Sequence, residues 1–283
     1  MATFRTCRDC LGTDSRALKT YKGETVLVCR QSPFNRLLLT EGNDGLRTLR
    51  FSEEGLRQSI VKKDDPEFLA LPYARVLVQS LAFISSPERL LVMGLGGGTL
   101  PRFFHKTLPE SIVEVVEIDP GVLEVAREFC GFREDERLRA YIEDGRDFIE
   151  RHKAAYDVIV LDCFSHEAIP EHLLTLEFLL EVRRSLSPEG IAVANIWGRT
   201  DNRLYEHMLL TYRAAFEEVY VLDVPDSGTK VFVALTQPTQ KSHGEIIEEL
   251  KRLGSRGAGP AAPARWRHSD LESLSNGKVL RDC

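Results

Sequence analysis

Residues 88 to 237 alternate short apolar runs with amphipathic segments, and no other feature restricts the fold of this chain as strongly. The apolar runs are RLLVMGL, IVEVVEI, LRAYIE, YDVIVLD and GIAVANIW. Helical patterns cover residues 99–107, 120–130, 145–154, 172–187 and 201–216. Short apolar strands that alternate with amphipathic helices are typical of a parallel sheet covered by helices on both faces. The pattern therefore predicts an α/β fold.

A last pair of strand-like segments, FEEVYVLDVP and KVFVALTQ, is separated only by the turn around DSGT. So short a connection suits an antiparallel hairpin and not a helical crossover. A parallel sheet that ends in such a hairpin is similar to the Rossmann-like fold of class I S-adenosylmethionine-dependent methyltransferases, and we expect that fold here.

The pattern of apolar and polar residues is different on either side of residues 88 to 237. Residues 24–65 alternate apolar and polar residues in ETVLVCR, NRLLLTEG, LRTLRF and LRQSIV, which predicts a small N-terminal antiparallel β domain. Residues 66–240 form the predicted α/β domain, beginning with a helical stretch that Pro72 delays. Residues 1–23 are expected to be a mobile N-terminus, and residues 241–283 a short helix, GEIIEELKRL, with a flexible tail.

Charge and apolar content exclude several classes of protein. The chain has 37 basic and 43 acidic residues, a net charge of −6, whereas a nucleic-acid-binding protein would present a basic face. No apolar run reaches the roughly 18 residues of a membrane span, and MATFRTCRDC lacks the apolar core of a signal peptide, so we expect a cytoplasmic protein. Cys7 and Cys10 form a C-x-x-C pair, but no second pair completes a zinc site, so no metal is expected.

A glycine-rich turn follows the first strand of the α/β region in LLVMGLGGGTLPRFF. Gly94, Gly96, Gly97 and Gly98 leave backbone amides free to face a ligand at the start of the next helix. A tight turn without a ligand is the alternative. The dinucleotide fingerprint requires glycine or alanine at the sixth position, which is Thr99 here, so NAD is disfavoured.

Three acidic residues follow the next strands of the same region. Glu117 ends the second strand, Asp144 follows the third, and Asp162 ends the fourth. The carboxyl ends of parallel strands are where open α/β sheets bind ligands, and an acid in the second of these positions can hold both ribose hydroxyls. Each acid alone could be a helix cap or a solvated group. All of them in order after the glycine turn predict a nucleoside site.

These segments together resemble the spermidine synthase family of polyamine aminopropyltransferases. VEIDPGVLEVAREF is similar to the family's ribose-binding strand, EDGRDFI to its adenine-contact segment and YDVIVLDCF to its catalytic strand. Further upstream, SPFNRLLL resembles the family's S-x-Y-Q strand, and EEGLRQS its D-G-x-x-Q hairpin. The resemblance covers about residues 24 to 237.

The resemblance implies roles for residues throughout this region. The donor nucleoside would be held by the glycine turn and by a further set, Asn35, Glu117, Ile118, Asp144 and Gly145. Gln58 and Tyr73 fall on family residues that contact the acceptor substrate, and Asp162 falls on the catalytic aspartate. Asp162 would take or orient a proton of the acceptor amine, and Tyr73 would help hold that amine. His166 and Glu167 in CFSHEAIP could assist.

The sequence also departs from the family pattern. The aspartate of the family's G-G-G-D-G-G loop, which binds the amine of decarboxylated S-adenosylmethionine, falls on Gly97. The D-S-S-D run becomes DCFS, so its second acid is Ser165, and the polar residue after the substrate tyrosine becomes Ala74. The nucleoside contacts are thus kept while the contacts specific to polyamines are changed.

These departures leave the transferred group open. An acid near the carboxylate of ordinary S-adenosylmethionine would repel it by about 1 to 4 kcal/mol. Since Gly97 removes that acid, we favour S-adenosylmethionine and methyl transfer to a small amine-type acceptor, and expect Gly97→Asp to reverse the donor preference. The alternatives are aminopropyl transfer from decarboxylated S-adenosylmethionine to a polyamine, aminocarboxypropyl transfer, and a non-catalytic nucleoside-binding homologue. A homodimer through the N-terminal strands is expected.

Overall fold

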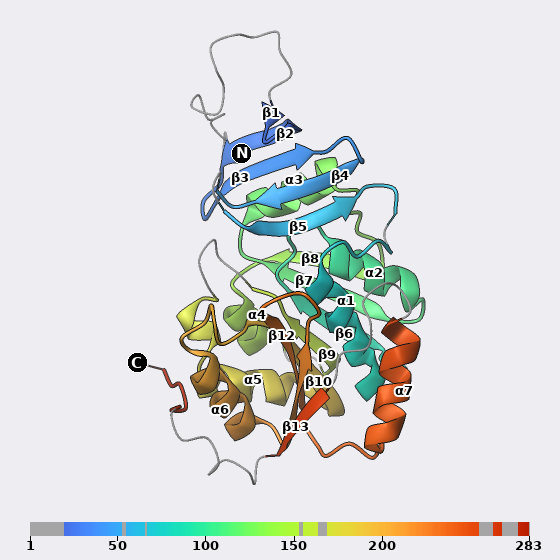
Figure 1. The fold of residues 1–283 in the computed structure, drawn as a ribbon, viewed down its shortest axis with the longest axis vertical. Helices are drawn as coiled ribbons and strands as arrows, with labels where there is room; N and C mark the ends of the chain where they lie inside the picture. Colours follow the sequence, from blue (N-terminus) through green and yellow to red (C-terminus); the bar gives the residue numbers. More distant parts are fainter. Residues whose placement is uncertain are drawn as a thin grey trace.

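The structure, a computed structural model, describes residues 20–52, 55–65, 67–152, 155–163, 169–254, 263–267 and 277–282. Two β-sheets organise the chain, the smaller one above the larger in Figure 1. The smaller sheet is antiparallel, in the order β1-β2-β3-β4-β5. Its strands are β1 (Thr20–Tyr21), β2 (Glu24–Gln31), β3 (Arg36–Glu41), β4 (Leu46–Arg50) and β5 (Arg57–Lys62). This is the N-terminal β domain that the alternating sequence predicts.

The larger sheet has eight strands in the order β13-β11-β12-β10-β9-β6-β7-β8. The strands from β10 to β8 are parallel, whereas β12, β11 and β13 are antiparallel to their neighbours. Their bounds are β6 (Arg89–Met93), β7 (Ile112–Glu117), β8 (Leu138–Ile142), β9 (Tyr156–Leu161), β10 (Leu186–Trp197), β11 (Glu218–Asp223), β12 (Thr229–Leu235) and β13 (Pro263–Arg267). The predicted parallel sheet with a terminal antiparallel hairpin, and with it the Rossmann-like methyltransferase-type fold, is confirmed.

Helices cover both faces of this sheet, with α4, α5 and α6 on one side and α1, α2 and α7 on the other in Figure 1. The α-helices are α1 (Pro72–Gln79), α2 (Thr99–Thr107), α3 (Pro120–Phe129), α4 (Gly145–Arg151), α5 (Leu176–Ser185), α6 (Tyr205–Ala215) and α7 (His243–Gly254). Two short 3₁₀ turns are η1 (Ser80–Phe83) and η2 (Glu171–Leu173). The first helical stretch begins at Pro72, as the sequence predicts, because proline suits the first turn of a helix.

Alternate residues of the central strands feed two separate hydrophobic cores. In β6, Leu90 and Val92 pack with α1, α2 and α7, whereas Leu91 and Met93 pack with α4, α5 and α6. All four side chains are fully buried, which explains why this strand is continuously apolar in the sequence.

The strand order places a ligand site between β6 and β9. The chain proceeds outward from β6 to β7 and β8, and then crosses back to β9 on the other side of β6. In open α/β sheets the crevice at such a reversal, at the carboxyl ends of the strands, is where ligands bind. The glycine turn after β6 and Asp162 after β9 lie on the two sides of this crevice.

The smaller sheet packs onto the loops at this end of the larger sheet. The Arg30 guanidinium donates to the carbonyl of Gly121 at 3.2 Å, and the Thr99 hydroxyl donates to the carbonyl of Ile60 at 3.2 Å. The Arg102 guanidinium likewise donates to the carbonyl of Lys63 at 2.8 Å. These bonds bring β5 directly above the glycine turn.

The C-terminal part of the chain differs from the predicted flexible tail. Beyond the predicted helix, β13 pairs with β11 and satisfies backbone groups at that edge of the sheet. In the terminal segment the carbonyl of Leu280 accepts a 2.8 Å bond from the amide of Leu176, a free donor at the start of α5. The carboxylate of Asp282 also pairs with Arg146 of α4 at 2.5 Å. Sequence periodicity could not reveal these bonds, because each joins the tail to a distant element.

Several expectations concern residues whose structure is not described. Of the predicted mobile N-terminus, residues 1–23, the structure describes only the part from Thr20 onward. Cys7 and Cys10 lie outside the described residues. Within the described ranges, no helix combines the length and the apolar character that crossing a membrane requires. Over the same ranges, no cluster of three or more potential metal ligands is found.

Candidate active site

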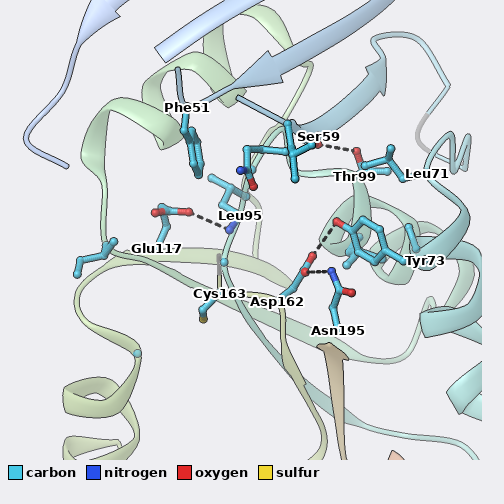
Figure 2. Close-up of a pocket in the computed structure, with 18 of the residues that line it drawn as sticks. Phe51, Ser59, Leu71, Tyr73, Leu95, Thr99, Glu117, Asp162, Cys163 and Asn195 are labelled. Carbon is cyan, nitrogen blue, oxygen red and sulfur yellow. Dashed lines mark hydrogen bonds between the residues drawn. The ribbon is translucent and has the colours of Figure 1, made fainter. Parts of the chain in front are cut away.

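A cavity of about 500 Å³ lies between the smaller sheet and the carboxyl ends of the parallel strands. Figure 2 shows Glu117 and Leu95 on one side of it and Tyr73, Asp162 and Asn195 on the other. The size falls in the range of ordinary small-molecule sites. The glycine turn, the acids after the strands and the residues from the smaller sheet therefore meet at one place, as the topology predicts.

At Gly94 the glycine turn requires a residue without a side chain, because the backbone of Asp162 lies very close. Gly94 has a φ of +94°, in the left-handed region that L-residues avoid. A Cβ at Gly94 would also overlap the backbone carbonyl oxygen of Asp162. The ends of β6 and β9 therefore touch through bare backbone at Gly94, and both Gly94 and Gly96 line the cavity.

Gly97 and Gly98 do not line the cavity with the other two glycines. A Cβ at Gly97 would overlap Cγ2 of Val61 in β5, and a Cβ at Gly98 would lie 2.8 Å from the Phe132 ring. The side chain of an aspartate at position 97 would therefore have to displace Val61. β5 thus covers this part of the turn, a contact that the sequence alone could not show, and the role of Gly97 in donor choice stays a prediction.

Glu117 ends β7 at the cavity wall and is only 8% exposed. One of its carboxylate oxygens accepts a 2.9 Å bond from the amide of Leu95, and the other a 2.9 Å bond from the amide of Asp119. Burial raises the pKa of Glu117, while these two amide bonds act in the opposite direction. Each oxygen keeps a further lone pair that could accept from a ribose hydroxyl.

Glu117→Ala is expected to weaken binding of the nucleoside donor by about 1.5 to 3 kcal/mol, the range for hydrogen bonds to charged groups. The substitution removes the predicted acceptor of both ribose hydroxyls and releases the amide of Leu95 in the glycine turn. Isothermal titration calorimetry with S-adenosylhomocysteine measures the change. Glu110→Ala, at an exposed position away from the cavity, is the matched control. Equal affinities for the two folded variants would contradict the assignment.

The other residues predicted to hold the donor also lie around the cavity, and two of them have structural roles as well. Asp144 caps α4 through a 2.8 Å bond from the amide of Arg146, and its other oxygen lies 3.0 Å from Nε2 of His172. Asn35 donates to Asp119 at 3.0 Å and so joins the smaller sheet to the start of α3. Ile118 and Gly145 line the wall beside them.

Asp162 lies at the other side of the cavity, held by two donors. The Tyr73 hydroxyl donates to Oδ2 at 3.0 Å, and Nδ2 of Asn195 donates to Oδ1 at 3.0 Å (Figure 2). Burial raises the pKa of Asp162, and the bonds from Asn195 and Tyr73 partly oppose that rise. Burial and the nearby charge of Asp162 raise the pKa of Tyr73 well above its usual range, so this phenol stays protonated and donates. The group is thus a fixed carboxylate that can receive a proton.

Sequence reasoning missed Asn195 and Arg57, which both line the cavity. Asn195 is 5% exposed near the carboxyl end of β10, and its signal was a polar residue within the apolar run GIAVANIW. Arg57 lies in β5 beside Gln58, which also lines the cavity, while contact of Gln58 with the acceptor stays a prediction. His166 and Ser165 lie outside the described residues, so their predicted positions stay predictions.

The chain is similar to known families over most of its length. Residues 72–229 match the Spermine/spermidine synthase domain. A polyamine aminopropyltransferase of Vibrio vulnificus (strain CMCP6) is 34% identical over 81% of this chain and 79% of its own length. An eEF1A lysine and N-terminal methyltransferase of Homo sapiens is 32% identical over 67% of this chain, but the match covers only 30% of that protein.

Solved structures share the fold of this chain. A probable spermidine synthase from Corynebacterium glutamicum ATCC 13032 matches 90% of this chain and 96% of its own with a TM-score of 0.75, at 21% identity. Human Methyltransferase-like protein 13 in complex with SAH matches 65% of this chain and 93% of its own, with a TM-score of 0.60 and 31% identity. The relatives therefore include both aminopropyltransferases and methyltransferases, and both kinds are transferases.

Proposed function

The chain belongs to the spermine/spermidine synthase family, and from this premise we propose that it transfers an alkyl group from an adenosyl sulfonium donor to an amine nitrogen. The observation that carries the proposal is the position of Asp162. Its carboxylate is fixed by Tyr73 and Asn195 in the same cavity as the predicted nucleoside-binding residues.

The donor end of the cavity supports this proposal through Glu117 and Asp144. Glu117 presents a buried carboxylate to the cavity, suited to a pair of ribose hydroxyls, and Asp144 lies after the neighbouring strand, suited to an adenine amino group. Exposed apolar side chains at Phe34 and Ile118 also line this wall and could cover the faces of a flat base. Among known relatives, human Methyltransferase-like protein 13 has been solved with SAH, the product of such a donor.

The chemistry required of the protein is modest. A bound sulfonium supplies an electrophilic carbon, so the acceptor amine needs only alignment and the loss of a proton. Asp162 accepts that proton, or orients the N–H bond, so that the nitrogen lone pair points toward the donor. As the new C–N bond forms, the C–S bond breaks, and its electron pair stays on sulfur as a neutral thioether. Tyr73 and Asn195 keep the carboxylate of Asp162 in place during this step.

Aminopropyl transfer from decarboxylated S-adenosylmethionine is the leading form of this reaction. The polyamine aminopropyltransferase of Vibrio vulnificus is similar over 79% of its own length, so the likeness covers most of that enzyme. The retained Tyr73–Asp162 pair also suits a cationic amine acceptor.

Methyl transfer from S-adenosylmethionine is the second candidate, favoured by the charges along the cavity. Arg57 lies on the cavity wall. Its positive charge repels the decarboxylated donor more strongly than S-adenosylmethionine, because the decarboxylated donor has one more net positive charge. No acidic side chain extends into the cavity from the described glycine turn, so nothing there would repel that carboxylate. The likeness to eEF1A lysine and N-terminal methyltransferases supports the same candidate.

The thioether by-product identifies the group that is transferred. The purified protein is incubated with an amine mixture and either donor, and the nucleosides are separated by mass spectrometry. We expect 5′-methylthioadenosine from decarboxylated S-adenosylmethionine, which marks aminopropyl transfer. S-adenosylhomocysteine from the intact donor would instead mark methyl transfer, and 5′-methylthioadenosine from the intact donor would mark aminocarboxypropyl transfer. Donor binding without any by-product would favour a non-catalytic homologue.

Two wider expectations belong with this proposal. A cytoplasmic location agrees with a reaction on small soluble amines. A homodimer through the smaller sheet agrees with its two edge strands, β1 and β5, each of which has one neighbour within the described residues. Both stay predictions.

A further inference from the structure

Little negative charge lines the acceptor end of the cavity. This end is defined here by Leu71, Tyr73, Ala74, Asp162, Asn195 and Trp197. Among the described residues that line it, Asp162 is the only carboxylate. The other acids that line the cavity among the described residues are at the donor end, where Glu117 ends β7 and Glu143 and Asp144 follow β8. Thr229, which pairs with Trp197 across β10 and β12, adds only a neutral hydroxyl.

Asp162 can balance a single ammonium group. Both of its oxygens already accept one hydrogen bond, from Tyr73 and from Asn195, and the remaining lone pairs point to one small region. Away from this carboxylate, Leu71, Ala74 and Trp197 offer apolar surface. A second ammonium bound against that surface would lose its water without meeting a carboxylate among the described residues, which is costly.

A cation on the cavity wall opposes a second ammonium further. Arg57 is exposed and lines the cavity, and within the described part of the chain its side chain makes no ion pair or hydrogen bond. The pairing of β5 with β4 shifts register between Ser59, which lies opposite Leu49, and Arg57, which lies opposite Arg50, so this end of β5 does not continue the face of Ser59 and Val61. Ser59 and Val61 lie directly over Gly96 and Gly97. Arg57 nevertheless lies on the wall of the same cavity as Asp162, so its charge acts on a cation bound there.

We propose that the acceptor is an amine with a single ammonium group on an otherwise uncharged or acidic body, and not a di- or polyamine. This inference rests on the proposed transfer to an amine nitrogen. Asp162, the only carboxylate among the described residues of the acceptor end, receives the reacting amine. The apolar wall receives an uncharged body, and Arg57 can pair with a carboxylate on that body. The chain would thus keep the family's reaction while accepting a less highly charged substrate.

Binding of matched four-carbon amines tests this inference without requiring turnover. Butylamine, 4-aminobutanoate and 1,4-diaminobutane are titrated into the protein saturated with S-adenosylhomocysteine, and in parallel with 5′-methylthioadenosine. We expect the diamine to bind about tenfold or more weakly than either monoamine. Tighter binding of the diamine, or binding of none of the three, would overturn the inference. Turnover is measured separately: binding in the expected order with no product from either donor would contradict the proposed function alone.

The charge of Arg57 gives a second, independent readout. Arg57→Glu adds a carboxylate to the wall and should strengthen binding of 1,4-diaminobutane about tenfold or more while changing that of butylamine about twofold at most. Lys62→Glu makes the same charge change at the other end of β5, where Lys62 pairs with Asp65 and does not line the cavity. That control should leave both affinities unchanged. An equal response of the diamine to the two variants would contradict the role of Arg57.

One further amine distinguishes an acceptor on a polypeptide from a free small-molecule acceptor. Nα-acetyl-lysine methylamide presents the same amine as a lysyl side chain within a polypeptide. If it binds more tightly than butylamine, the acceptor is an amine on a polypeptide, and if it binds more weakly, the acceptor is a free small monoamine. Either order agrees with the inference provided that 1,4-diaminobutane remains the weakest ligand.

Discussion

Asp162→Asn is expected to lower kcat by about 10²- to 10⁴-fold, the usual effect of losing a general base. The amide keeps the shape of the side chain, so the Tyr73 hydroxyl retains an acceptor, but it cannot take up a proton. Donor affinity should change less than about threefold, because Asp162 lies across the cavity from Glu117 (Figure 2). Initial rates on an acceptor identified by mass spectrometry, together with donor calorimetry, check both expectations.

Asp64→Asn makes the same chemical change at an exposed residue outside the cavity and serves as the control. Its kcat should equal that of the parent protein. If Asp162→Asn turns over within a few-fold of this control, Asp162 is not the proton acceptor, whatever its position suggests.

The pH dependence of activity follows from the same site. Asp162 must be ionised to accept a proton, and burial raises its pKa, so the rate should fall as the pH drops through that raised value. Asn195 stabilises the ionised form through its N–H bond, and this lowers the pKa. Asn195→Leu should therefore move the acid limb of the pH–rate profile to higher pH. An acid limb that stays in place would show that a different group governs it.

The fold could be predicted from the sequence where local pattern and burial agree. The strands β6 and β9 are apolar on both faces because two cores contact them, and their continuous apolar runs predict a parallel sheet without any knowledge of the contacts. The residues at which helices begin and end are harder to predict from local pattern. The pattern over 172–187 predicts one helix, but α5 begins only at Leu176, because the side chain of Thr175 accepts from the amide of Phe178 and caps it.

The candidate site could be predicted only where topology determines it. Glu117, Asp144 and Asp162 follow successive parallel strands, and strands of one sheet present their carboxyl ends to the same crevice. The parts that could not be predicted depend on contacts between distant segments. Val61 of β5 covers Gly97, and Asn195 of β10 meets Asp162 of the neighbouring strand. No spacing in the sequence indicates that either pair is in contact.

Asp144 both caps a helix and lines the cavity. The sequence left open whether this acid caps a helix or faces a ligand. In the structure it caps α4 and also lines the cavity, because the helix starts at the cavity wall. The amides at this helix start and the predicted adenine contact are therefore fixed by the same side chain.

Gly94→Ala is expected to destabilise the protein by about 3 kcal/mol or more and to abolish most activity in the fraction that remains folded. An L-residue in the left-handed region costs about 1 to 2 kcal/mol, and overpacking a tight contact costs about 1 to 3 kcal/mol in addition. Both apply here, because Gly94 has a φ of +94° and an added Cβ would overlap the backbone carbonyl of Asp162. Urea denaturation measures the stability, and initial rates measure the activity.

Gly45→Ala separates the two contributions to this loss. Gly45 also has a positive φ, +76°, but an added Cβ there meets no atom within 4 Å, so only the backbone cost of about 1 to 2 kcal/mol applies. The excess destabilisation of Gly94→Ala over Gly45→Ala then measures the close approach of the β6 and β9 ends. Relief of that overlap must displace the backbone of Asp162, and a shift of about 1 Å in a catalytic group can cost 10²-fold in rate. Equal stability of the two variants, with full activity of Gly94→Ala, would mean that the glycine is not needed to position Asp162.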